Sequence, residues 1–252
     1  MFSVSRRDQV RQGLLDRARQ DDRLVAAAVT GSRAEGREDR WSDIDLYLGV
    51  RDGVAVDPVV ADWSAFCHDR LGAVHHFVLR TGNAAYRAFL LDDGLQVDLG
   101  FTPAAGFGPV GDGAFAVVFG RAGPRRPTPP DVDFLMGMAW HHLLHARASI
   151  ERGELWRAEH WISAARDVAL SLASIRHGLA HTYARGADAL PEAVTAPVHG
   201  TLLRELTPAE ATRALTAVTD VVLRELSCTE REVAARLAAP LAALLADLRA
   251  RP

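Results

Sequence analysis

Two aspartates separated by one residue, Asp43 and Asp45, stand at the start of an apolar run that ends at Val50. The Ile, Leu, Tyr and Val content of this run predicts a short buried strand. Because side chains two apart in a strand point to the same face, the two carboxylates should lie side by side while Ile44 faces the core. Adjacent carboxylates repel each other, and a hard divalent ion such as Mg²⁺ prefers oxygen ligands. The pair therefore predicts a divalent-metal site.

A third carboxylate, Asp98, interrupts a later apolar run at residues 95–101, which follows a turn signal at residues 92–94. The alternation of apolar and other residues in this run predicts a strand. An acidic side chain is unusual there. It is explained if Asp98 faces Asp43 and Asp45 and completes the metal site.

A glycine–serine pair, Gly31-Ser32, lies between the apolar run at residues 24–30 and the aspartate pair. Glycine permits a turn that other residues resist, and Ser32 is expected to cap a short helix over residues 33–38. The start of a helix presents free backbone N–H groups to an anion. A phosphate held beside a carboxylate-bound metal is the arrangement used in phosphoryl and nucleotidyl transfer.

These motifs together resemble those of the DNA polymerase β-like nucleotidyltransferase superfamily. Within it, residues 31–36 and 42–46 are most similar to the small bacterial antibiotic nucleotidyltransferases, which act on aminoglycosides or lincosamides. The resemblance covers residues 24–101, and the remainder agrees with the family only in its general helical character.

The resemblance also implies roles for single residues. Gly31 and Ser32 would contact the nucleotide phosphates, and Asp43, Asp45 and Asp98 would hold magnesium. In some branches of the superfamily the later strand carboxylate also deprotonates the acceptor. In others a glutamate of the helical domain does so.

Further candidate residues lie near the turn and on a predicted helix at residues 153–178. Arg33 and Ser42 flank the predicted phosphate site, although a solvated arginine and a structural serine are equally ordinary interpretations. Glu159, Ser163 and Arg166 share one helix face by their spacing. We expect Arg166 to contact triphosphate and Glu159 to serve as an alternative general base, but a solvated polar stripe would show the same spacing.

The composition excludes several classes of protein. The chain has 252 residues, a net charge of −3 and 29 basic residues, all of them arginine, so that no lysine-based phosphate site or Schiff base exists. The mild charge argues against a nucleic-acid surface. Cys67 and Cys228 form no disulfide or zinc pattern. We expect a cytoplasmic protein, because no signal peptide or membrane span is predicted.

The expected fold class is α+β: an N-terminal nucleotidyltransferase domain over residues 1–125, with a small mixed sheet flanked by helices, and a C-terminal helical bundle over residues 126–252. A Pro-rich stretch at residues 125–130 predicts the linker between them. The other predicted elements are helices at 5–20, 57–71, 131–151, 208–226 and 229–249 and strands at 73–80, 85–91 and 114–119, the last at a sheet edge. Ser5 is a candidate cap of the first helix, and capping-box-like sequences at residues 207–210 and 229–232 open the last two helices.

The expected activity is transfer of AMP from ATP, with two magnesium ions, to a hydroxyl of a small molecule, either an aminoglycoside or a lincosamide. The expected partners are thus a nucleoside triphosphate and a small acceptor, without nucleic acid or membrane, and a homodimer is plausible. Two alternatives remain open. One is a protein-modifying nucleotidyltransferase of the antitoxin type, and the other is an inactive homologue that only binds nucleotide.

Overall fold

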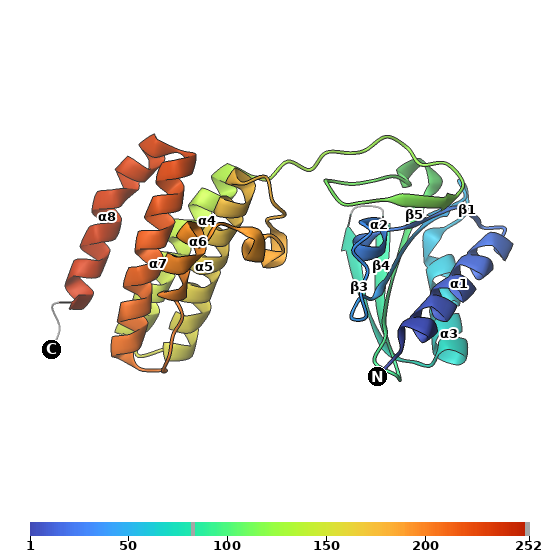
Figure 1. Cartoon of the computed structure of the whole chain (residues 1–252), viewed down its shortest axis with the longest axis horizontal. Helices are drawn as coiled ribbons and strands as arrows, with labels where there is room; N and C mark the ends of the chain where they lie inside the picture. Colours follow the sequence, from blue (N-terminus) through green and yellow to red (C-terminus); the bar gives the residue numbers. More distant parts are fainter. Residues whose placement is uncertain (82–83, 250–252) are drawn as a thin grey trace. The chain divides into compact units, whose positions relative to one another are not determined.

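The computed structural model describes residues 1–81 and 84–249. It divides into two compact units, Met1–Pro129 and Pro130–Pro252 (Figure 1). The first unit is built on a mixed sheet and the second is entirely helical. The predicted α+β class, with a sheet-containing first part and a helical second part, is confirmed.

A single mixed sheet forms the centre of the first unit. Within the described residues its strand order is β3-β4-β5-β2-β1-β6. The β2 and β5 strands run parallel, and the other neighbours are antiparallel. The bounds are Leu24–Val29 for β1, Ile44–Val50 for β2, Ala73–Thr81 for β3, Ala84–Leu91 for β4, Gln96–Pro103 for β5 and Ala116–Phe119 for β6, an edge strand as predicted.

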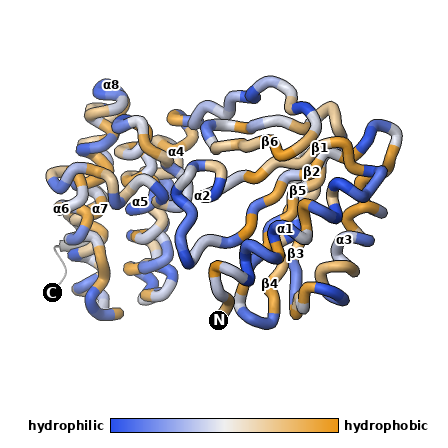
Figure 2. The backbone as a smooth tube through the Cα atoms, turned by 45° about the vertical axis from the view of Figure 1, so that its right-hand side comes forward, coloured by the Kyte–Doolittle hydropathy of each residue, from blue (hydrophilic) through white to orange (hydrophobic). Residues whose placement is uncertain are grey.

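One face of this sheet is covered by two helices, α1 (Val4–Gln20) and α3 (Val56–Leu71). Their apolar side chains pack on the alternate strand residues that point toward them, including Ile44, Leu46 and Leu48 of β2. The hydrophobic colouring of β1, β2 and β5 in Figure 2 follows this burial. The alternation sends Asp45 and Tyr47 to the opposite face.

The opposite face is only partly covered. A small cluster around Tyr47 and Phe107 packs there, beneath the segment that contains the 3-10 helix η1 (Ala104–Gly106) and β6. The end of the face that carries Asp45 and Asp98 stays half-buried. Acidic side chains there can therefore keep contact with solvent while the sheet holds the strands that carry them.

Two predicted helix starts are wrong. Helix α1 is capped by the Ser3 hydroxyl, which accepts from the Arg6 N–H, and not by Ser5. The short helix after β1 is α2 (Gly31–Ala34), whose N-cap residue is Thr30. Ser32 therefore lies inside the helix rather than capping one over residues 33–38, because the chain enters its first helical turn directly at Gly31.

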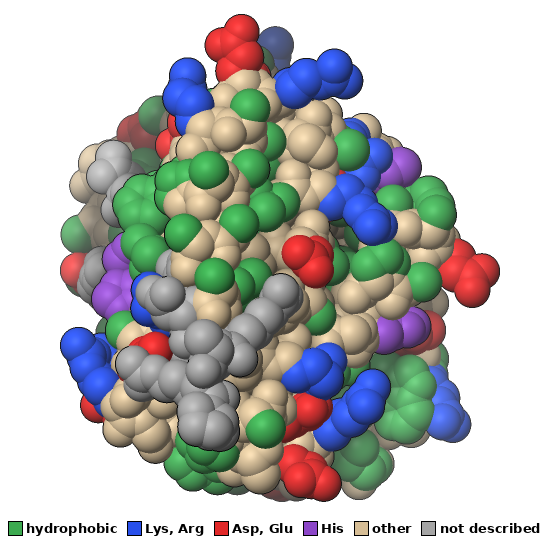
Figure 3. Space-filling model, turned by 90° about the vertical axis from the view of Figure 1, so that its left-hand side faces the viewer, with side chains coloured by type: hydrophobic (Ala, Val, Ile, Leu, Met, Phe, Trp, Pro, Cys, Tyr) green, Lys and Arg blue, Asp and Glu red, His purple; other side chains and the backbone are tan. Residues whose placement is uncertain are grey.

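The second unit is a helical bundle with its own core. Its long helices are α4 (Val132–Glu151), α5 (Leu155–Arg176), α7 (Pro208–Thr229) and α8 (Arg231–Arg249). Buried Leu143, Ile162, Leu172, Leu215 and Val222 belong to one continuous apolar cluster. On the face seen in Figure 3, hydrophobic side chains lie among basic and acidic ones.

The segment between α5 and α7 is more structured than the sequence predicts. It contains two 3-10 turns, η2 (Thr182–Ala184) and η3 (Ala187–Ala189), and a short helix, α6 (Glu192–His199), with Pro197 inside it. None of these has enough turns to show a helical period. No helix within residues 1–81 and 84–249 combines the length and the apolar character that a bilayer crossing needs.

The two predicted capping boxes of the bundle have different outcomes. The Thr207 hydroxyl accepts from the Glu210 N–H at 3.3 Å and caps α7 as predicted, although the Glu210 carboxylate binds the Arg204 N–H instead of reaching back. Thr229 does not cap α8. It ends α7, and its hydroxyl donates to the Glu225 carbonyl at 2.8 Å.

Candidate active site

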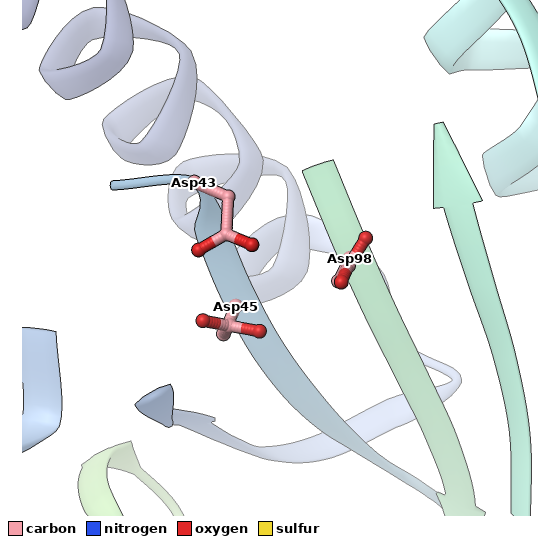
Figure 4. Close-up of side chains that lie close together, drawn as sticks. All are labelled: Asp43, Asp45 and Asp98. Atoms are coloured by element: carbon pink, nitrogen blue, oxygen red, sulfur yellow. The ribbon is translucent and has the colours of Figure 1, made fainter. Parts of the chain in front are cut away.

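Three carboxylates from two strands meet at one end of the sheet. Asp43, Asp45 and Asp98 each offer an oxygen, and these oxygens lie within 4.8 Å of one another. Figure 4 shows the three carboxylates turned toward the same space. The predicted convergence of these side chains is confirmed.

The parallel pairing of β2 and β5 produces this convergence. In the register of the two strands Asp45 lies directly opposite Asp98. Asp43 precedes the first residue of β2, so the same alternation directs it to the face of Asp45. A register shift of one residue would send Asp98 to the helix-covered face.

The electrostatics of the site favour a bound cation. The pKa of Asp98 is raised, mainly because burial disfavours its charged form and also because Asp43 carries a like charge nearby. The Gln96 side-chain amide opposes this effect by donating to both Asp98 oxygens at 3.0 Å. Three convergent carboxylates are a suitable ligand set for Mg²⁺, which binds through a few carboxylates and substrate phosphates.

Gln96 was not among the residues predicted from the sequence. It lies two positions before Asp98, and the strand alternation therefore places both side chains on the same face. This spacing could have identified it.

Gly31 brings the turn after β1 into close contact with the acidic cluster. Its φ is +60°, and a Cβ atom built on it would lie 2.0 Å from Asp45 Oδ2. The Thr30 N–H also donates to the Asp45 backbone carbonyl at 3.1 Å. A glycine is thus required here both for the left-handed conformation and for the space beside the carboxylate.

The three polar residues predicted near the turn lie in different surroundings. Ser32 and Ser42 line a pocket of about 410 Å³ that also reaches Asp43 and Gln96. The Ser42 hydroxyl is engaged with Asp39, accepting from its N–H at 2.9 Å and donating to its carboxylate at 3.0 Å. Arg33 is exposed and pairs with the nearly buried carboxylate of Glu38 at 3.0 Å. The two bonds between Ser42 and Asp39 give Ser42 a structural role in the turn.

A buried ionic cluster, which the sequence did not indicate, anchors the loop between the turn and β2. Glu38 is nearly enclosed and pairs with two arginines of α1, Arg7 and Arg11, which are themselves buried. Arg7 also donates to the backbone carbonyls of Asp39 and Ser42. Helix α1 thereby fixes the loop that leads into Asp43.

Glu159 and Arg166 belong to α5 of the second unit. The predicted shared face is confirmed by a chain of hydrogen bonds, in which Ser163 Oγ donates to Glu159 and accepts from Arg166 Nη1. Arg166 also donates to the hydroxyl and the carbonyl of Thr201. Their contacts lie within the helical unit, and the roles expected of them in the reaction stay predictions.

Comparison with known proteins gives a structural similarity and no sequence family. No protein-family profile matches the chain, and no curated protein does. Among 22 matching chains of solved structures is an aminoglycoside 6-adenyltransferase from Bacillus subtilis, with 14% identity and a TM-score of 0.40 over 92% of this chain and 95% of that one. At this degree of similarity, function is inferred below from the side chains of the site.

Proposed function

We propose that the protein is a magnesium-dependent nucleotidyltransferase that moves AMP from ATP to a hydroxyl of a small molecule. The observation that carries this proposal is the meeting of Asp43, Asp45 and Asp98 within 4.8 Å, beside the glycine turn. A cluster of this kind fits two hard cations that neutralise a phosphate group.

In the proposed reaction the acceptor oxygen attacks the α-phosphorus, and the bond to pyrophosphate breaks. Bound Mg²⁺, held by Asp43, Asp45 and Asp98, would lower the pKa of the acceptor hydroxyl and stabilise the leaving pyrophosphate. The turn at Gly31 and Ser32 would bind the outgoing phosphates through backbone N–H groups. Arg33 and Arg166 are the arginines proposed to add positive charge there.

Asp98 is the proposed general base, and Glu159 is the alternative. The position of Asp98 beside the other two carboxylates, where the metal and the acceptor hydroxyl would meet, supports this choice. Ser42 is proposed as a further phosphate contact, for which its hydroxyl would exchange its bond to Asp39.

The test is incubation of the purified protein with Mg²⁺, labelled ATP and a panel of aminoglycosides, lincosamides and other hydroxyl compounds. We expect a labelled AMP adduct and release of pyrophosphate. The Asp43→Asn and Asp45→Asn variants should lose both. Pyrophosphate release that persists in the double variant would refute the mechanism, and AMP found on a protein instead of a small molecule would support the protein-modifying alternative.

A further inference from the structure

A second pocket lies on the same face of the sheet as the carboxylates. Its volume is about 570 Å³, and its lining includes Tyr47 of β2, Thr102 of β5, Tyr86 of β4, and Val110, Arg126 and Thr128 of the segment that follows β5. All of these residues belong to the first unit. The metal chemistry proposed above does not use this pocket.

Two tyrosine rings form one wall of the pocket, and a glycine makes room for them. Tyr47 and Tyr86 stack with their centroids 5.7 Å apart. Gly100 lies beside both rings, since a Cβ there would come within 2.5 Å of Tyr47 and 2.6 Å of Tyr86. The half-buried Tyr86 ring can thus contact a planar or apolar group, and the buried Tyr47 ring supports it from the other side.

The pocket lies on the side of the metal site that is away from the phosphate turn. Tyr47 and Gly100 follow Asp45 and Asp98 by two residues, or about 7 Å along the strands. Gly31 lies at the other end of β2, where the Thr30 N–H donates to the Asp45 carbonyl. It directly follows Thr30 after β1, the strand that pairs with β2 on the side opposite to β5. In phosphoryl transfer the attacking and leaving oxygens are roughly in line. If pyrophosphate leaves toward Gly31, the acceptor approaches from the side of this pocket.

The charges of the pocket select its ligand. Among the described residues that line it, Arg126 is the charged one, and the others are apolar or neutral. Burial and the neighbouring Tyr47 hydroxyl raise the pKa of Tyr86, so this phenol stays neutral at physiological pH. A polycation would lose its hydration here and meet a like charge, whereas a carboxylate or phosphate would gain a partner.

The exposed Arg126 is anchored at two points, one on its backbone and one on its guanidinium. Its Nη2 donates to the Gly106 carbonyl at 2.8 Å, and its backbone N–H donates to the Pro109 carbonyl at 2.9 Å. Since an arginine has five N–H donors, others are left to bind a ligand. The bond to Gly106 removes part of the side-chain freedom that would otherwise be lost when an anion binds.

We propose that this pocket binds the acceptor, and that the acceptor is a hydroxyl compound with a flat aromatic or apolar face and an anionic group, not a polycationic aminoglycoside. The proposal rests on the proposed nucleotidyl transfer and names the class of its second substrate.

The test uses three benzyl alcohols of matched shape: 4-(hydroxymethyl)benzoate, benzyl alcohol and 4-(aminomethyl)benzyl alcohol. Their binding to the full-length protein with Mg²⁺ is measured by ligand-observed NMR titration. We expect the anionic probe to bind at least about tenfold more tightly than the cationic one, a difference of about 1.4 kcal/mol. The Arg126→Gln variant should lose this preference, and Arg121→Gln, an exposed arginine outside the pocket lining, should keep it.

Two further measurements separate this proposal from the proposed function. Gly100→Ala should weaken all three probes by closing the space at the tyrosines, and Asp45→Asn should leave probe binding intact while abolishing AMP transfer. Equal binding of anion and cation, an unchanged preference in Arg126→Gln, or displacement of the probe by AMP would overturn the acceptor pocket. Probe binding without AMP transfer to any hydroxyl compound would support the pocket and contradict the transferase.

Discussion

The role of single residues is clearest at Gly31, where the backbone and the acidic cluster meet. Replacement by alanine forces an unfavourable left-handed conformation and places a methyl group against the Asp45 carboxylate. We expect Gly31→Ala to lower AMP transfer by at least about 100-fold, because misplaced ligands bind and orient the metal poorly. The measurement is the initial rate of transfer together with the Mg²⁺ concentration at half-saturation.

Gly36→Ala is the matched control for this variant. Gly36 also has a positive φ, +70°, but a Cβ there has open space around it. The left-handed conformation should cost each of the two alanine variants about 1 kcal/mol of stability. Gly36→Ala should nevertheless keep the Mg²⁺ dependence of the wild type. Equal loss of activity in both variants would assign the effect to backbone strain alone.

The identity of the general base is a second question at this scale. We expect Asp98→Asn to lower kcat by at least about 100-fold and Glu159→Gln by less than about tenfold, since a positioned base contributes about 10²–10⁴ in rate. Mg²⁺ half-saturation measured in parallel separates metal binding from proton transfer. A loss of more than 100-fold in Glu159→Gln at unchanged Mg²⁺ affinity would instead identify Glu159 as the base.

The sequence predicts the acidic residues better than their surroundings. Asp43, Asp45 and Asp98 could be placed because strand alternation is regular. Ser32 was wrongly predicted as a helix cap because several neighbouring residues satisfy the same capping preference. The burial of Glu38 could not be predicted, since it depends on arginines of α1 about 30 residues earlier in the chain.

At the scale of elements, the contact of α1 with the loop before β2 should control the stability of the site. Glu38→Gln would leave Arg7 and Arg11 buried without their carboxylate. Removing one partner of a buried ion pair costs about 3–5 kcal/mol, and we expect a loss at the lower end because Asp8 remains near both arginines. The measurement is the free energy of unfolding in urea.

Glu35→Gln is the control for this change. Glu35 pairs with Arg37, whose side chain is 77% exposed, and an exposed ion pair contributes about 0–1 kcal/mol. Its loss should be barely measurable. Similar losses in the two variants would show that the α1 cluster does not hold the loop.

A chain of hydrogen bonds through two histidines joins α3 to the neighbouring strands β3 and β4. Because the Arg87 guanidinium can only donate, His76 Nε2 accepts from it at 2.6 Å. His76 Nδ1–H then donates to His68 Nε2 at 2.8 Å, and His68 Nδ1–H donates to the Ala73 carbonyl at 2.7 Å. A proton added to His76 Nε2 would break its bond to Arg87.

This chain predicts a loss of stability in mild acid. The pKa of His76 is lowered, first by burial and then by Arg87, so below about pH 6.5 the unfolded chain binds the proton that the folded chain excludes. Stability should therefore be full above that pH and should fall as the pH drops below it. Urea unfolding of the wild type and of His76→Gln measures this, and an equal pH dependence in both would contradict it.

The strands and long helices follow from the sequence because their apolar periods are long enough to be recognised. The predicted run from Ile44 to Val50 coincides with β2, and the predicted helix at 131–151 differs from α4 by one residue. The region 179–207 gave no prediction, because its turns and its eight-residue helix complete too few periods.

At the scale of the whole molecule, the two units have separate hydrophobic cores. One core lies between α1, α3 and the sheet, and the other lies within the bundle. Such units tend to unfold as independent cooperative blocks, and a ligand stabilises the block that binds it. The three carboxylates all belong to the first unit.

We therefore expect two transitions in calorimetric unfolding, and Mg²⁺ with a non-hydrolysable ATP analogue should raise chiefly the one that belongs to the first unit, where all three carboxylates lie. At 100 times the dissociation constant the stabilisation should be about 2.7 kcal/mol, and Asp45→Asn should abolish it. Leu215→Ala would open a cavity in the core of the bundle. It should lower the unfolding temperature of the helical unit and leave the nucleotide-induced rise of the first unit's transition unchanged. A smaller rise of the helical unit's transition, lost in Arg166→Gln, would support the proposed contact of Arg166 with the triphosphate, and an unchanged helical transition would contradict that contact.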